Sequence, residues 1–147
     1  MILVIDTKRG INCYFYSRMS FAFPKREKLK SRKTLERLFA EGRSLTKFPL
    51  RMIFLETTSP GQPPVQVAVT VPKRNFKRAV DRNRIKRLLR ESYRQNKGLI
   101  FNNIEGNFAF LFLYLGKELP TFKQVEQSML TIFRQFNELL NDEKELK

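Results

Sequence analysis

Histidine is absent from this chain of 147 residues, and cysteine occurs only once, at Cys13. A single cysteine forms no intramolecular disulfide and cannot supply a cysteine-based zinc site. Without histidine, the chain lacks both a Ser–His triad and the usual general base near neutral pH. Its 14 acidic residues are scattered singly or lie near the C-terminus. The sequence therefore shows no carboxylate cluster of the kind that holds a catalytic metal ion.

Long apolar runs are also missing. The longest, residues 108–115, has eight residues, whereas a membrane-spanning helix needs about 20. At the N-terminus a short apolar run precedes Lys8 and Arg9, the reverse of the order in a secretory signal. We therefore expect a cytoplasmic protein that does not associate with membranes.

The composition, 41% hydrophobic with 14 phenylalanines, is sufficient for one domain with a packed core. Ser31 is a suitable N-cap for a short helix closed by Gly42. Leu35, Leu38 and Phe39 form the apolar side of that helix. This pattern predicts the first helix of the domain.

Three strands and a final helix complete the predicted core. Residues 50–55 are typical of a strand, and residues 65–71 alternate valine with other side chains, which indicates a half-buried strand with its valines inward. Residues 108–115 are continuously apolar, as in a central strand buried on both faces. Thr121 and Gln124 have capping-box spacing, and an apolar helical pattern follows for about five turns.

The charge pattern is most unusual in residues 72–97. Eleven of these 26 residues are Lys or Arg and only two are acidic, so the segment carries +9 of the chain's net charge of +15. On a helix, one side would be apolar and the other mostly basic. The apolar side would contain Ile85, Leu88, Leu89 and Tyr93. Because like charges one turn apart destabilise a helix, the pattern indicates that a polyanion binds here, with a solvated charged face as the alternative.

The order of elements predicts an α+β fold in two layers, with a small mixed sheet and helices packed on one face. Written along the chain, the order is α-β-β-(β)-α-β-α, where the bracketed strand is optional.

Residues 79–91, AVDRNRIKRLLRE, together with Pro72-Lys73-Arg74 before them, resemble the RNR signature of the protein subunit of bacterial ribonuclease P. The resemblance extends from about Phe23 to the last helix. It implies a left-handed crossover between the strands on either side of the basic helix, against the usual rule. It also implies a domain of residues 19–147, because the chain from Met19 onward resembles the beginning of a family member. Residues 1–18 are then an N-terminal extension, either disordered or created by a misassigned start site, or else an additional strand.

The resemblance implies the accessory subunit of an endoribonuclease. Such a subunit binds ribonuclease P RNA and the 5′ leader of precursor tRNA, and the RNA carries out the Mg²⁺-dependent hydrolysis that removes the leader. No catalytic or metal-binding residue is expected in the protein alone, and no obligate protein partner. Two alternatives are a structural ribosomal protein without a role in tRNA processing and a DNA-binding module that lays the basic helix in a major groove.

Two sets of site residues follow from the resemblance. The residues that would bind the catalytic RNA are Lys73, Arg74, Arg82, Asn83, Arg84, Lys86, Arg87 and Arg90. The residues that would line a cleft for the leader are Leu35 and Phe39, at positions where family members carry an aromatic pair. Leu35 offers an apolar surface without ring stacking.

Three residues, one on the first helix and two in the basic segment, have a second interpretation. Phe39 is either a stacking residue or part of the core. Asn83 either forms hydrogen bonds to RNA or fixes the neighbouring backbone, or else it is the N-cap of the basic helix. Phe76, in the basic loop, is either an exposed stacking residue or a plug in the core.

Overall fold

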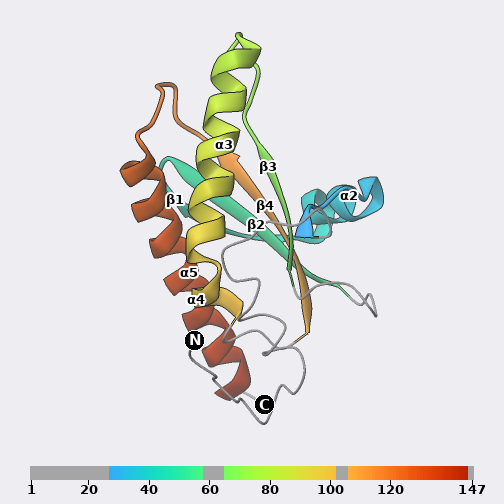
Figure 1. Cartoon of the computed structure of the whole chain (residues 1–147). Helices are drawn as coiled ribbons and strands as arrows, with labels where there is room; N and C mark the ends of the chain where they lie inside the picture. Colours follow the sequence, from blue (N-terminus) through green and yellow to red (C-terminus); the bar gives the residue numbers. More distant parts are fainter. Residues whose placement is uncertain (1–26, 58–64, 102–105, 146–147) are drawn as a thin grey trace.

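The computed structural model describes residues 27–57, 65–101 and 106–145 (Figure 1). Along the chain its elements are α2 (Arg32–Glu41), β1 (Arg43–Lys47), β2 (Leu50–Thr57), β3 (Val65–Thr70), α3 (Ala79–Asn96), α4 (Gly98–Phe101), β4 (Asn107–Tyr114) and α5 (Phe122–Glu145). This order confirms the prediction, with β1 as the optional strand and α4 as a short addition. The expectations for residues 1–18 lie outside the described residues. None of the described helices has the combination of length and apolar composition that a bilayer span requires.

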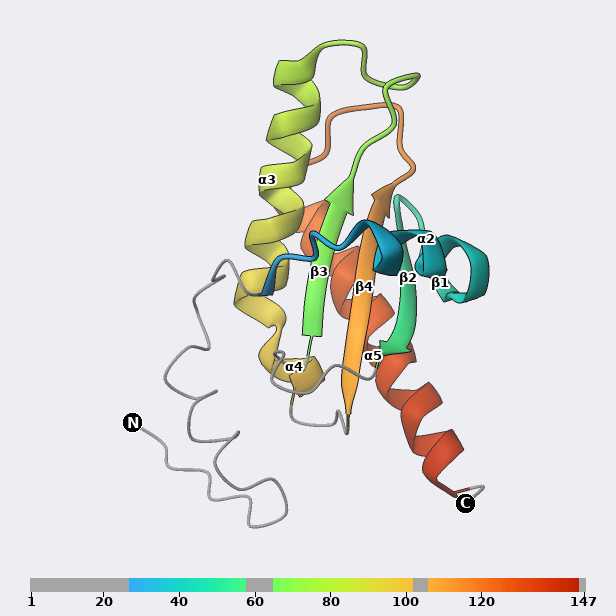
Figure 2. The same ribbon diagram turned by 90° about the vertical axis from the view of Figure 1, so that its right-hand side faces the viewer.

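The described strands form one mixed sheet in the order β1-β2-β4-β3. β2 pairs antiparallel with β1 and β4, whereas β3 pairs parallel with β4. In Figure 2 both β3 and β4 point upward, β4 lies to the right of β3, and the connecting helix α3 lies on the far side of the sheet. The crossover is therefore left-handed, as the resemblance implied, against the rule for most parallel strand pairs.

One face of the sheet packs against α3 and α5 and contains most of the aromatic core. The ring of Phe136 in α5 meets Phe54, Phe110 and Phe108 edge-on, at centroid distances of 5.0, 5.1 and 5.5 Å. Edge-to-face pairs of this kind are favourable beyond the area that they bury. The alternate valines of residues 65–71 lie in or against the same cluster, as the period of two predicted.

Helix α2 lies on the opposite face of the sheet (Figure 2). Leu38 of α2 is completely buried in one cluster with Ile53 of β2 and Leu111 of β4. The predicted arrangement with all helices on one face is therefore wrong for α2, although the α+β class and the mixed sheet are confirmed. The physical reason is that β2 and β4 carry apolar side chains on both faces, so the second face also needs cover.

The ends of α2 are held as the sequence predicted. The Thr34 amide donates a hydrogen bond to Ser31 Oγ at 3.4 Å, and the Gly42 amide donates to the Leu38 carbonyl at 2.9 Å. A Cβ atom at Gly42 would lie 2.6 Å from Ile53 Cγ2. Glycine therefore allows the chain to turn tightly against β2 as it leaves the helix.

Candidate nucleic-acid interface

Helix α3 presents its charged side to solvent because its apolar side is anchored in the core. Ile85, Leu89 and Tyr93 are completely buried, and Leu88 packs against the same cluster. This outcome confirms the predicted apolar side of the basic helix. The long cationic side chains on the other side therefore project away from the sheet.

The structure brings the predicted RNA-binding residues together on α3 and on the loop before it. Lys73, Arg74, Asn83, Arg84, Arg87 and Arg90 are exposed, and Arg82 and Lys86 are half-buried. Within residues 27–57, 65–101 and 106–145, none of these seven cations forms an ion pair with a carboxylate. Such a surface attracts polyanions, because only mobile counterions otherwise balance its charge.

Arg82 holds the basic loop in place from within α3. Its Nη1 atom donates hydrogen bonds to the carbonyls of Phe76 and Lys77, at 2.9 and 3.0 Å. The Phe76 side chain is only 7% exposed, and its ring centroid lies 5.8 Å from that of Tyr114. Of the two interpretations, Phe76 is therefore the one packed in the core, and the next two residues of the loop, Lys77 and Arg78, are exposed.

Asn83 is the fifth residue of α3, because the helix begins at Ala79 with Arg78 at the N-cap position. The N-cap interpretation of Asn83 is therefore wrong. Its amide is exposed and makes no side-chain hydrogen bond to any other residue that the structure describes. The donors and the acceptor of this amide are open to a ligand.

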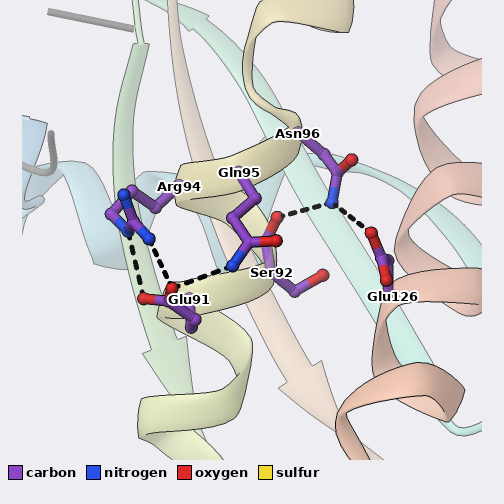
Figure 3. A network of polar contacts seen from close by, with 6 residues as sticks. All are labelled: Glu91, Ser92, Arg94, Gln95, Asn96 and Glu126. Carbon is purple, nitrogen blue, oxygen red and sulfur yellow. Dashed lines mark hydrogen bonds and ion pairs between the residues drawn. The ribbon is translucent and has the colours of Figure 1, made fainter. Parts of the chain in front are cut away.

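Arg94, near the end of α3, differs from the seven cations above because it forms an ion pair with a carboxylate, that of Glu91 (Figure 3). Its Nε atom donates to Glu91 Oε2 at 3.0 Å, and Gln95 Nε2 donates to Glu91 Oε1 at 2.9 Å. These hydrogen bonds, first from Arg94 and then from Gln95, lower the pKa of Glu91 from 4.5 to about 2. Separately, Asn96 Nδ2 donates to the Ser92 carbonyl at 2.9 Å and to Glu126 Oε1 on α5 at 3.4 Å. The part of the basic surface whose cations have no acidic partner therefore ends before the last turn of α3, where Arg94 pairs with Glu91.

The two predicted leader-binding residues lie one turn apart on α2 and differ in exposure. Leu35 is half-buried against the cluster under α2, whereas Phe39 is 64% exposed. The core interpretation of Phe39 is therefore wrong. An aromatic ring that is largely open to solvent is suited to stacking on an unpaired base.

Sequence reasoning missed Phe48, which lies in the turn between β1 and β2. This side chain is 71% exposed, more than any other large hydrophobic side chain among the described residues. The only signal in the sequence is a phenylalanine between Lys47 and Pro49, in a short connection between two strands. Because a strand end and a turn are equally consistent with those residues, its exposure is apparent only in the structure.

Comparison with known families gives one match over most of the chain. Residues 23–137 match the family model described as Ribonuclease P. The ribonuclease P protein component of Porphyromonas gingivalis is 34% identical over 113 residues, which cover 75% of this chain and 82% of that protein. The corresponding protein of Chlorobium phaeobacteroides is 32% identical over 118 residues, covering 71% and 81%.

Solved structures show the same fold. The ribonuclease P protein from Thermotoga maritima superposes with a TM-score of 0.60 at 25% identity, covering 74% of this chain and 96% of that one. The Staphylococcus aureus protein, at 18% identity, also gives 0.60 and covers 74% and 93%. The family model, the related sequences and the solved structures all indicate the same family. The chain therefore belongs to the family of ribonuclease P protein components.

Proposed function

We propose that this accessory subunit of ribonuclease P binds the catalytic RNA with the basic surface of α3 and the loop before it. The observation that carries the proposal is the set of seven cations without acidic partners, among the residues that the structure describes, on a helix whose other side is anchored in the core. Phosphate groups would supply the counter-charge, and arginine can bind a phosphate with two parallel hydrogen bonds. Asn83 would add hydrogen bonds to RNA without adding charge.

The 5′ leader of precursor tRNA would bind at α2, on the other face of the sheet. Phe39 offers a ring that is 64% exposed, and Leu35 offers a half-buried apolar surface one turn away. Stacking on aromatic rings tolerates any base, because every base has a π-face. This property suits a leader whose sequence differs from one tRNA precursor to another.

The Mg²⁺ ions of the reaction would be held by the RNA. Among the residues that the structure describes, no group of three or more Asp, Glu, His or Cys side chains could hold a metal ion. Carboxylate oxygens are the protein ligands that Mg²⁺ prefers, so these residues do not fit a resident magnesium site. We therefore assign the protein a role in binding and positioning, which would be carried out in the cytoplasm.

Reconstitution tests this function. The protein is added to the ribonuclease P RNA of the same organism at low Mg²⁺, and cleavage is measured on precursors with leaders of one and of several nucleotides. We expect stimulation of cleavage that grows with leader length. A structural ribosomal protein would bind RNA without stimulating cleavage, and that result would overturn the proposal. Hydrolysis of the precursor by the protein alone would also overturn it.

A further inference from the structure

A groove separate from both surfaces lies between the β1–β2 turn, the end of β4 and the start of α5. Phe48 and Leu119, two of the five large hydrophobic side chains that are exposed among the described residues, both line it. Lys47 and Lys117 also line the groove, and both are exposed. Glu118 is the single carboxylate among the lining residues. An exposed aromatic ring beside lysines is the composition of surfaces that bind single-stranded nucleic acid.

The residues of helix α5 that line the groove are polar but uncharged. Gln124, Gln127 and Thr131 all line it. Gln124 Oε1 already accepts from the Thr121 amide, and the Thr131 hydroxyl already donates to the Gln127 carbonyl. The Gln127 side-chain amide, the Gln124 Nε2 donor and the Thr131 hydroxyl as an acceptor can still pair with the polar edge of an unstacked base. A purely apolar groove would favour a hydrophobic peptide instead, because it would leave the polar edge of a base unsatisfied.

Hydrogen bonds hold the walls of the groove in place. Ser128 Oγ on α5 donates to the Phe48 carbonyl at 3.2 Å, and the Leu115 amide donates to the Pro49 carbonyl at 2.7 Å. The Tyr114 hydroxyl donates to the Glu118 carbonyl at 2.6 Å. The backbone that carries Phe48 is therefore fixed before a ligand arrives, which lowers the entropy cost of binding.

Tyr114 connects this groove to the basic surface. It lines the groove and also packs against Phe76, the anchor of the basic loop. In Figures 1 and 2 the loop before α3 and the connection from β4 to α5 lie at the same end of the molecule. One RNA could therefore occupy both surfaces.

We propose, on the basis of the function proposed above, that this groove is a second RNA subsite. It binds an unpaired nucleotide of the catalytic RNA, with the base stacked on Phe48 and the adjoining phosphates close to Lys47 and Lys117. The overall net charge of +15 and the two lysines favour RNA over a protein partner as the occupant.

The test measures the affinity of the protein for ribonuclease P RNA as a function of salt concentration. Phe48→Ala should weaken binding roughly ten-fold and leave the slope of log K against log salt unchanged, because stacking releases no counterions. Phe48→Tyr, which keeps a ring, should restore most of the affinity. The double variant Lys47→Ala/Lys117→Ala should instead make the slope shallower, by roughly 0.7 to 0.9 for each phosphate that the protein no longer neutralises.

Leu99→Ala is the matched control, because Leu99 is also an exposed large hydrophobic residue and is absent from the groove. It should bind RNA as the wild type does.

A direct readout of contact between RNA and Phe48 is ultraviolet cross-linking with RNA that contains 4-thiouridine, followed by mass spectrometry. A cross-link within the tryptic peptide of residues 48–51 supports the subsite.

The outcomes separate this inference from the function on which it rests. If Phe48→Ala binds like the wild type and no cross-link forms in that peptide, the groove is not an RNA subsite, whereas weaker binding by Arg87→Ala/Arg90→Ala would still support the proposed function. If neither set of variants changes RNA binding, both proposals fail. Thermal denaturation of each variant shows whether it is folded.

Discussion

Lys97, at the end of the basic segment, forms a buried ion pair with Glu27. Its Nζ atom lies 3.1 Å from Glu27 Oε1 and 3.0 Å from Oε2, and the side chains are 0% and 7% exposed. The pair ties the end of α3 to the chain that leads into α2, across the sheet edge where the Leu29 amide donates to the Val67 carbonyl. It therefore connects the two helices that are proposed to bind different RNAs.

Lys97→Met should destabilise the protein by about 3 to 5 kcal/mol, because the Glu27 carboxylate would stay buried without this counter-charge. The double variant Lys97→Met/Glu27→Leu should recover most of that stability, since neither charge is then buried. Urea unfolding measures both. If Lys97→Met alone were as stable as the wild type, the conclusion that Lys97 stabilises the buried Glu27 carboxylate would be contradicted.

Glu91 should make stability depend on pH at the acidic end. Its pKa falls from 4.5 to about 2 on folding, so its contribution is complete above pH 4.5 and is lost as the pH falls toward 2. The side chain is 41% exposed, so that contribution should be below about 1 kcal/mol. The free-energy difference between the wild type and Glu91→Gln, measured by urea unfolding, should shrink steadily between pH 5 and about pH 2. A difference that is constant with pH would contradict this assignment.

Arg87→Ala/Arg90→Ala should weaken binding to ribonuclease P RNA and reduce the salt slope by roughly 1.4 to 1.8, the value for two phosphates that the protein no longer neutralises. Both side chains are exposed, so stability should change little. Arg134→Ala, an exposed arginine on α5, is the control and should leave the slope unchanged. Filter-binding titrations at several salt concentrations give the slopes. Arg82 is a poorer choice, because its substitution also releases the basic loop.

Phe39→Ala should lower affinity for a precursor with a long leader roughly ten-fold and leave affinity for mature tRNA unchanged. Its effect on stability should be within about 0.5 kcal/mol, because the side chain is mostly exposed. Leu38→Ala on the same helix should instead cost about 2 to 5 kcal/mol, because Leu38 is completely buried. Equilibrium binding and urea unfolding distinguish the two effects. An equal decrease in affinity for both RNAs would argue against leader binding by Phe39.

Local pattern was sufficient to predict six of the described elements and the outward side of α3, but it located neither β1 nor α4. The capping box is an example: the Thr121 amide donates to Gln124 Oε1 at 3.1 Å, and the Gln124 amide donates to Thr121 Oγ1 at 3.3 Å. Such features depend on residues a few positions apart, whose relative placement follows from the helix and strand periods. The crossover hand followed from the family resemblance instead, since local pattern favours the opposite hand.

Interactions between distant residues were decided only by the tertiary structure. Glu27 and Lys97 are 70 positions apart, and no periodicity specifies that they meet. The same holds for the burial of Phe76 against Tyr114, the exposure of Phe39 and the packing of α2 on the second face of the sheet. The sequence by itself determined which side chains need a core or a counter-charge. The tertiary structure decided which residues pack against those side chains or pair with those charges. The reason is that the strand order β1-β2-β4-β3 determines which distant segments lie next to one another.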